Sequence, residues 1–254
     1  MNSDIDYARL FDRYDANPDR HQIAADTEIL RLLKQGDSGG ITRILDVACG
    51  TGNWLAVQMQ AYASQPVEWH GLDASAEMLG VARVKVPTAQ LVIGRAELLP
   101  YGDGGFNLVS TNFAFHHFAD KATALKEMIR VLAAGGSLRM NNMAAERADH
   151  WWLYRYFPEA RAIDRGRFWS VDRIVAELRG RGFTCEVDFS LDDRPVRLTT
   201  KLEEAIRRDV SELNLISDQA YSDGLAALAR DLAAAPDSEI APGLPIYSLL
   251  ARKP

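Results

Sequence analysis

A glycine-rich turn directly after a buried apolar run constrains the fold of this chain more than any other feature. The run Ile44–Val47 contains a single carboxylate, Asp46, and is followed by the turn Cys49-Gly50-Thr51-Gly52. Because glycine has no Cβ, such a turn lets a ligand approach the backbone closely. Residues 44–53 therefore predict a strand, a turn and the start of a helix that together border a ligand site.

Short apolar runs alternate with helical patterns through the first 140 residues. Strands are predicted at residues 44–47, 68–73, 91–93, 108–111 and 138–143. Helices are predicted at residues 53–62, after Ser75, and between Asp120 and Leu132, where Gly135-Gly136 should end the last of them. Single helices between strands imply right-handed crossovers and a parallel sheet that is covered on both faces. We therefore expect an α/β, Rossmann-like fold.

Beyond residue 145 the pattern changes. An aromatic segment, Trp151–Pro158, comes first, and two more strands are predicted at residues 183–189 and 246–251. Further helices are predicted after Ser170 and at residues 199–215 and 222–234. No linker divides the chain, so we expect one domain over residues 1–254. Within it we expect an N-terminal helical lid, residues 1–35, and a helical substrate cap made by the insertions 145–169 and 190–240.

Composition excludes several classes of protein. The chain has 254 residues, of which 47% are hydrophobic and 25% charged, as in soluble globular proteins and unlike disordered or fibrous ones. A net charge of −6 disfavours a general nucleic-acid binder. Two distant cysteines indicate no disulfide framework, and neither a membrane span nor a signal peptide is recognisable. We expect a cytoplasmic protein that binds neither nucleic acid nor membrane, and the oligomeric state stays open.

An acidic residue after the second predicted strand adds a second part to the ligand site. Asp73 lies 21 residues beyond Gly52, close to the ~20-residue spacing at which a carboxylate accepts hydrogen bonds from ribose hydroxyls. The alternative is that Gly50 and Gly52 only make a tight turn and that Asp73 only caps a helix. The combination favours an adenosine-type ligand. A dinucleotide fits less well, because Leu55 occupies the position of the third glycine.

Five ordered motifs resemble those of the class I S-adenosylmethionine-dependent methyltransferases, in particular the small-molecule, ubiquinone-biosynthesis-like branch. The motifs are the turn from Asp46 to Gly52 and the segments Gly71–Leu79, Ala96–Tyr101, Phe115–Phe118 and Glu127–Leu138. The resemblance covers roughly residues 40–143 and the seventh strand. It implies a seven-stranded, mostly parallel sheet and S-adenosylmethionine as the cofactor.

The resemblance also implies which residues bind this cofactor. Gly50 and Gly52 would border its methionine portion, Asp46 would lie near its amino group, and Asp73 would bind its ribose hydroxyls. Further expected cofactor contacts are Tyr14, Ala48, Ala74, Met78, Ala96, Glu97 and Asn112. Two positions depart from the family pattern: Arg95 replaces an acid that often meets the adenine amine, and Asn107 replaces a frequent aspartate.

The implied reaction is in-line transfer of the sulfonium methyl group to a small-molecule acceptor. His116 and His117 follow the fourth strand, and we expect only one to face the acceptor. His117 is the candidate general base and His116 a candidate acceptor contact, unless both are structural. No metal is expected, because adjacent histidines without nearby acids make a poor site. Trp151, Trp152 and Tyr154 are expected to line an apolar acceptor pocket, to anchor the insertion helices in the core, or to do both.

Other functions remain open at this point. A non-catalytic module that binds S-adenosylmethionine and regulates a partner would carry the same motifs. An aminopropyltransferase would keep the fold but would need acids along a polyamine channel. A DNA-directed enzyme is disfavoured, because Thr111-Asn112-Phe113-Ala114 stands where amino-directed DNA methyltransferases carry Asn/Asp-Pro-Pro-aromatic. The acceptor and the methylated atom are not identified by the sequence.

Overall fold

The computed structural model describes residues 23–35 and 40–254, which fall into two compact units. The sheet unit contains the described residues up to Asn142, together with Ile174–Asp188 and Ser248–Pro254. The helical unit contains residues Met143–Arg173 and Phe189–Tyr247. The structure thus divides into two separately packed units, and one domain over residues 1–254 stays a prediction.

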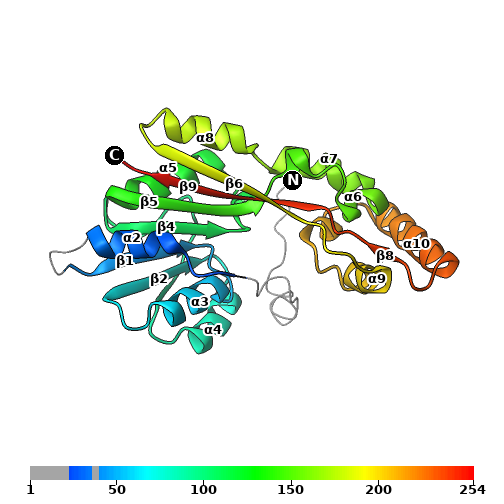
Figure 1. Ribbon diagram of the computed structural model, residues 1–254, viewed down its shortest axis with the longest axis horizontal. Coiled ribbons are helices and arrows are strands. Elements are labelled where there is room, and N and C mark those ends of the chain that lie inside the picture. Colours follow the sequence, from blue (N-terminus) through cyan, green and yellow to red (C-terminus); the bar gives the residue numbers. More distant parts are fainter. Residues whose placement is uncertain (1–22, 36–39) are drawn as a thin grey trace. The chain divides into compact units, whose positions relative to one another are not determined.

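A seven-stranded sheet with the order β3-β2-β1-β4-β5-β9-β6 runs through the sheet unit (Figure 1). β1 pairs in parallel with β2 and with β4, and the pairs β2–β3 and β4–β5 are also parallel. The strands are β1 (Thr42–Val47), β2 (Val67–Asp73), β3 (Gln90–Ile93), β4 (Phe106–Asn112), β5 (Leu132–Met143), β6 (Thr184–Asp192) and β9 (Leu244–Arg252). The predicted Rossmann-like, mostly parallel sheet is confirmed.

Helices between the strands begin where the sequence provides caps. Ser75 Oγ accepts a hydrogen bond from the Met78 amide at 3.1 Å, and Asp120 accepts from the amides of residues 122 and 123. The helices are α2 (Thr27–Gln35), α3 (Asn53–Ala61), α4 (Ala76–Lys85), α5 (Lys121–Val131) and α8 (Val171–Arg179). Of the expected lid, residues 1–22 with Tyr14 lie outside the described residues. α2 packs Ile29 and Leu32 into the buried core of the sheet unit.

Two predicted boundaries are wrong. Gly135-Gly136 do not end a helix, because α5 ends at Val131 and β5 begins at Leu132. The pairing of β4 with β5 then shifts between residues 106 and 108, so a bulge absorbs the glycines. The predicted helix 199–215 ends at Arg207, since Arg208 adopts a left-handed conformation with φ 53°. A separate 3-10 turn, η5 (Ser211–Asn214), follows it.

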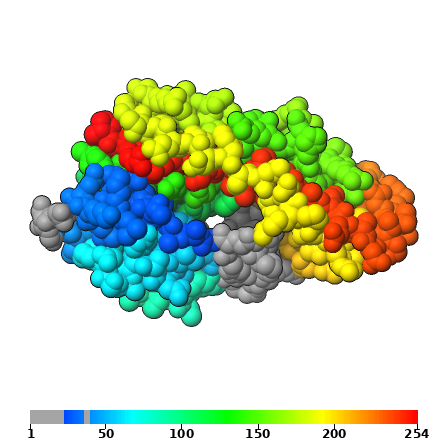
Figure 2. All heavy atoms as spheres, in the orientation of Figure 1, coloured from blue at the N-terminus to red at the C-terminus, as the bar shows by residue number. Residues whose placement is uncertain are grey.

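The helical unit has a core of its own, rich in aromatic side chains. Trp152, Leu153 and Phe157 are buried there, and α9 and α10 contribute Ala205 and Leu228. Its elements are η4 (Ala145–Arg147), α6 (Trp152–Tyr156), α7 (Pro158–Arg167), β7 (Val196–Arg197), α9 (Leu198–Arg207), η5, α10 (Asp218–Ala234) and β8 (Glu239–Ile240). α10, orange in Figure 2, lies on the outside of this unit.

The insertions 145–169 and 190–240, expected to form the cap, fall within this unit. That they cover a substrate stays a prediction. Over residues 23–35 and 40–254, no helix is both long enough and apolar enough to cross a membrane.

Gly224 in α10 tests how tightly the core of the helical unit is packed. A Cβ at this position would collide with the ring of Phe157 and stand 2.8 Å from the carbonyl oxygen of Tyr156. We predict that Gly224→Ala lowers the free energy of unfolding by about 1–3 kcal/mol, because overpacking displaces the ring or the helix. Urea denaturation followed by tryptophan fluorescence measures the loss.

Gly166→Ala in α7 is the matched control, because no atom of the described residues lies within 4 Å of a Cβ built there. Helix propensity alone should make that variant neutral or up to about 1 kcal/mol more stable. Equal effects of the two substitutions would contradict the prediction.

Candidate active site

The turn between β1 and α3 contains three residues with positive φ in alternation. Ala48, Gly50 and Gly52 have φ angles of 59°, 54° and 79°. A Cβ at Gly52 would lie 3.2 Å from a methyl group of Val86 and 3.3 Å from the Cβ of Ala82. Among the residues that the structure describes, none has an atom within 4 Å of a Cβ built at Gly50. Gly52 is therefore needed for packing of the turn against α4, whereas Gly50 borders open space in which a ligand can approach the backbone.

Asp73, at the carboxyl end of β2, fixes this turn from the side. Its Oδ2 accepts a hydrogen bond from the Gly50 amide at 2.8 Å, and its Oδ1 accepts from the Ser75 amide at 2.9 Å. Burial raises the pKa of Asp73, and these backbone hydrogen bonds act against that rise. The side chain is only half-buried. Each carboxylate oxygen keeps a lone pair that can accept from a ligand hydroxyl.

Asp46, just before the turn, belongs to a hydrogen-bonded chain of buried and half-buried polar side chains. Its Oδ1 accepts hydrogen bonds from Ser110 Oγ at 2.7 Å and from Asn112 Nδ2 at 3.1 Å. The Asn112 side-chain oxygen accepts in turn from Asn141 Nδ2 at 2.7 Å. The network joins the carboxyl ends of β1, β4 and β5. Asp46 is 2% exposed, and burial raises the pKa of its carboxyl to about 7.

The two histidines share the 3-10 turn η3 (Phe115–His117) after β4. Their ring centroids lie 3.8 Å apart, so the rings contact each other and do not diverge as their adjacency suggested. His116 is buried, and its Nδ1 lies 3.1 Å from Asn142 Nδ2. His117 is half-buried. The role of His117 as a base, and of His116 as an acceptor contact, stays a prediction.

Glu97 holds the loop after β3 in place. Its Oε1 accepts hydrogen bonds from the amides of residues 119 and 120 at 2.9 and 3.3 Å, and its Oε2 lies 3.5 Å from Nε of Arg95. The Glu97 carboxylate is therefore already used within the protein, while Arg95 is largely exposed. Among the remaining expected cofactor contacts, Ala74 is exposed, whereas Met78 and Ala96 are buried.

The three aromatic residues expected at the acceptor pocket lie in the core of the helical unit. Trp151, Trp152 and Tyr154 are 5%, 3% and 7% exposed. Tyr154 donates a hydrogen bond to Asp164 Oδ2 at 2.9 Å. Anchoring the helices of this unit is therefore one of their roles, and contact with an acceptor stays a prediction.

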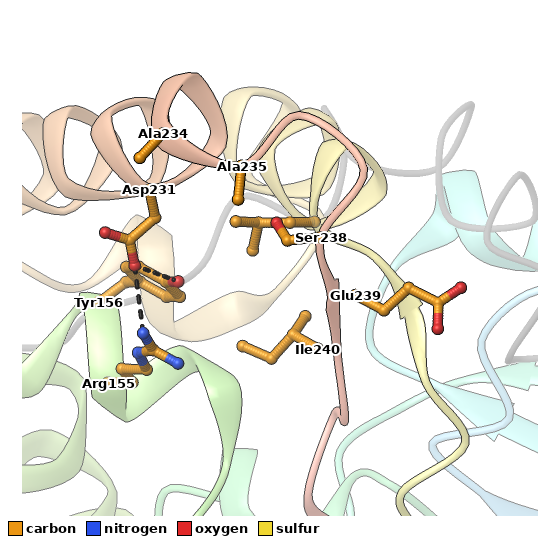
Figure 3. Close-up of a pocket in the computed structure, with 9 residues that line it drawn as sticks. Arg155, Tyr156, Asp231, Ala234, Ala235, Ser238, Glu239 and Ile240 are labelled. Atoms are coloured by element: carbon orange, nitrogen blue, oxygen red, sulfur yellow. Dashed lines mark hydrogen bonds and ion pairs between the residues drawn. The ribbon is translucent and has the colours of Figure 1, made fainter.

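A cavity of about 320 Å³ in the helical unit was not anticipated (Figure 3). Asp231 Oδ2 lies at its wall and accepts hydrogen bonds from Tyr156 at 2.9 Å and from Arg155 at 3.2 Å. None of the described residues expected to bind the cofactor lines it, so it is distinct from the site at the glycine turn. The lining residues are Arg155, Tyr156, Leu198, Asp231, Ala234, Ala235, Ser238, Glu239 and Ile240.

Three polar residues near the carboxyl ends of β4 and β5 were not predicted from the sequence: Ser110, Asn141 and Asn142. Central parallel strands are normally apolar along their length, because both faces are buried. β4 and β5 instead carry polar residues at their carboxyl ends, which is a readable signal of a hydrogen-bonded site. Within the described part of the chain, no cluster of three or more His, Cys, Asp or Glu residues is arranged to hold a metal ion.

The glycine turn and the polar ends of β4 and β5 lie where the strand order reverses, between β1 and β4. In open α/β sheets the ligand crevice lies outside the carboxyl ends of the strands at this reversal. Residues 44–136 match the family model described as a methyltransferase domain. Residues 44–136 are therefore similar to a methyltransferase domain, and the strand order and the glycine turn support this assignment.

Similar proteins agree with this assignment. Demethylmenaquinone methyltransferase of Chlorobaculum tepidum is 44% identical over 106 residues, which cover 42% of this chain and 43% of that enzyme. The chain thus spans less than half the length of this relative. A structure from Anabaena variabilis, described as a methyltransferase from an antibiotic biosynthesis pathway, covers 90% of this chain and 98% of its own at 21% identity, with a TM-score of 0.67. Phosphoethanolamine N-methyltransferase 2 of Haemonchus contortus, solved with S-adenosyl-L-methionine, covers 90% and 52% at 20% identity, with a TM-score of 0.53.

The raised pKa of Asp46 predicts a pH dependence of stability. The folded carboxyl titrates near pH 7, against a usual value of 3.8. The folded state therefore keeps the proton longer than the unfolded state. Asp46 destabilises the fold progressively between about pH 4 and pH 7, and the cost is constant above that window. Asp46→Asn should gain about 2–4 kcal/mol relative to wild type as pH rises from 4 to 8.

Urea denaturation at a series of pH values measures this difference. Asp188→Asn, at an exposed position of β6, is the control and should follow wild type at every pH. A wild-type minus Asp46→Asn difference that does not change with pH would contradict the assignment.

Proposed function

We propose that the chain transfers the methyl group of S-adenosylmethionine to a small-molecule acceptor. The observation that carries the proposal is the pairing of open space at Gly50 with a half-buried carboxylate at Asp73, held together by one hydrogen bond. The accessible backbone at Gly50 fits the methionine part of this cofactor. The Asp73 carboxylate beside it can accept hydrogen bonds from the two ribose hydroxyls. The named relatives, which are methyltransferases, support the same conclusion.

The residues that would hold the cofactor follow the carboxyl edge of the sheet. The turn of Ala48, Gly50 and Gly52 would border the methionine portion, with Asp46 and Asn112 behind it. Asp73 would bind the ribose hydroxyls. Residues expected beside the adenine are Ala74, Met78, Ala96 and Glu97, with Tyr14 as an N-terminal contact. Because Arg95 replaces the usual acid and already faces Glu97, we propose that adenine is held by backbone groups and apolar contacts.

When bound, this cofactor would supply a methyl group on a positively charged sulfonium, whose neutral thioether leaves without an acid catalyst. The protein's share is to orient the acceptor, to exclude water and, for a hydroxyl or thiol acceptor, to remove a proton. We propose that His117 removes this proton. His117 is half-buried beside His116 in the turn after β4. Asn142, which lies 3.1 Å from His116, would keep the paired rings in place.

The acceptor is proposed to be a small organic molecule that the helical unit selects. The relatives are named for demethylmenaquinone, but the family match ends at residue 136, before the helical unit begins. Their acceptor is therefore no guide to the one used here. The net charge of −6 supports an acceptor other than nucleic acid. The unpaired thiols of Cys49 and Cys185 support a reducing, cytoplasmic location.

Isothermal titration calorimetry with S-adenosylmethionine and S-adenosylhomocysteine tests the cofactor half of this function. Asp73→Ala should weaken binding of both ligands by about 1–3 kcal/mol, because hydrogen bonds to a charged, partly buried acceptor are lost. Asp188→Ala, on the exposed face of β6, should bind both ligands like wild type. Wild-type affinity in Asp73→Ala would remove the ribose assignment.

Transfer of an isotope-labelled methyl group into a metabolite extract tests the chemical half. His117→Ala should lower the rate of labelling by about 10²–10⁴-fold without changing cofactor affinity, if its imidazole removes the acceptor proton. His150→Ala, an exposed histidine of the helical unit, is the control. Full labelling by His117→Ala would show that the acceptor is only oriented. Cofactor binding by wild type without any labelled product would favour a regulatory module.

A further inference from the structure

Phe113 combines a strained backbone with an exposed aromatic side chain. Its φ is 51°, in the left-handed region, and its side chain is 44% exposed. Residues with bulky side chains are rare in this region, because the Cβ crowds the backbone. Such strain persists where the surroundings enforce it, and it concentrates at functional sites.

The surroundings of Phe113 do enforce this conformation. Its amide donates a 2.7 Å hydrogen bond to the carbonyl oxygen of Asn141 on β5. The preceding residue, Asn112, is held on both sides through its hydrogen bonds with Asp46 and Asn141. The same polar network that joins β1, β4 and β5 therefore fixes the loop that carries the ring.

Phe113 also stands at the reversal of strand order. Asp46 of β1 pairs with Ser110 of β4, and both strands end within two residues of that pair. Phe113 is the first residue after β4, so it lies next to the turn that begins at Ala48. Core packing does not explain an aromatic residue here, because Phe113 is exposed and not buried. A glycine would make the same turn without strain.

The order of the proposed cofactor contacts indicates what the ring faces. Asp73 on β2 would hold the ribose and the turn after β1 would border the methionine portion. The next position along this edge is the end of β4. We propose that Phe113 contacts the positively charged sulfonium of S-adenosylmethionine and thereby makes the site prefer this cation to its neutral product, S-adenosylhomocysteine. The inference rests on the proposed function, and its physical basis is the attraction of a cation to an aromatic face.

Calorimetry on the full chain with the two ligands separately tests the inference, and no acceptor is needed. In wild type, S-adenosylmethionine should bind more tightly than S-adenosylhomocysteine. Phe113→Leu keeps an apolar side chain but removes the aromatic face. It should reduce this preference by about 2- to 30-fold through weaker binding of the cation alone. Phe113→Tyr should restore the wild-type preference.

Phe113→Gly separates strain from recognition. It should lose the preference like Phe113→Leu, and its melting temperature should be equal to or above that of wild type, because glycine relieves the strained φ. Unchanged affinities in Phe113→Leu, or equal losses for both ligands, would overturn the inference while leaving the proposed function intact. Failure of wild type to bind either ligand would overturn both.

Discussion

The parallel pairing of β1 with β4 is the constraint on which the rest of the structure depends. β2 and β3 lie on one side of β1, and β4 and β5 lie on the other, so consecutive crossovers leave the pair in opposite directions. Their loops separate there and leave the crevice that open α/β sheets use for ligands. Asp46 links the two strands, because its buried carboxyl accepts a hydrogen bond from Ser110 of β4. Burial nevertheless disfavours the charged form of this carboxyl, which is why its pKa is raised to about 7.

The candidate site is rigid because backbone and side chains restrain each other. The Gly50 amide donates to Asp73, which fixes the turn to β2, while Asn112 and Asn141 extend the Asp46 network to β5. Two residues other than glycine, Ala48 and Phe113, keep positive φ on either side of the reversal. A site preorganised in this way loses less conformational entropy on binding a ligand than a flexible one would.

The aromatic segment of the helical unit packs into a core, a role that its sequence did not distinguish from lining a pocket. Trp152 and Tyr154 are buried among the helices of this unit, and Tyr154 donates to Asp164. Burial and the neighbouring charge of Glu212 raise the pKa of Asp164 to about 8, while Arg167 lies within 4 Å of both carboxyl groups. The unit therefore encloses a buried acid pair beside Arg167, and its separate apolar core explains why it forms a compact unit by itself.

The sequence by itself determined the elements whose causes are local. Glycines after β1 allow positive φ, Ser75 and Asp120 cap the helices that follow them, and apolar runs mark the strands. It did not determine where α9 ends, because the left-handed Arg208 has neither a glycine nor a proline to mark it. Only the tertiary structure decided which polar groups meet: Asp46 with Ser110, Asn112 with Asn141, and His116 with Asn142. These partners are 26 to 64 residues apart, and strand pairing, which no local preference encodes, brings them together at one edge of the sheet.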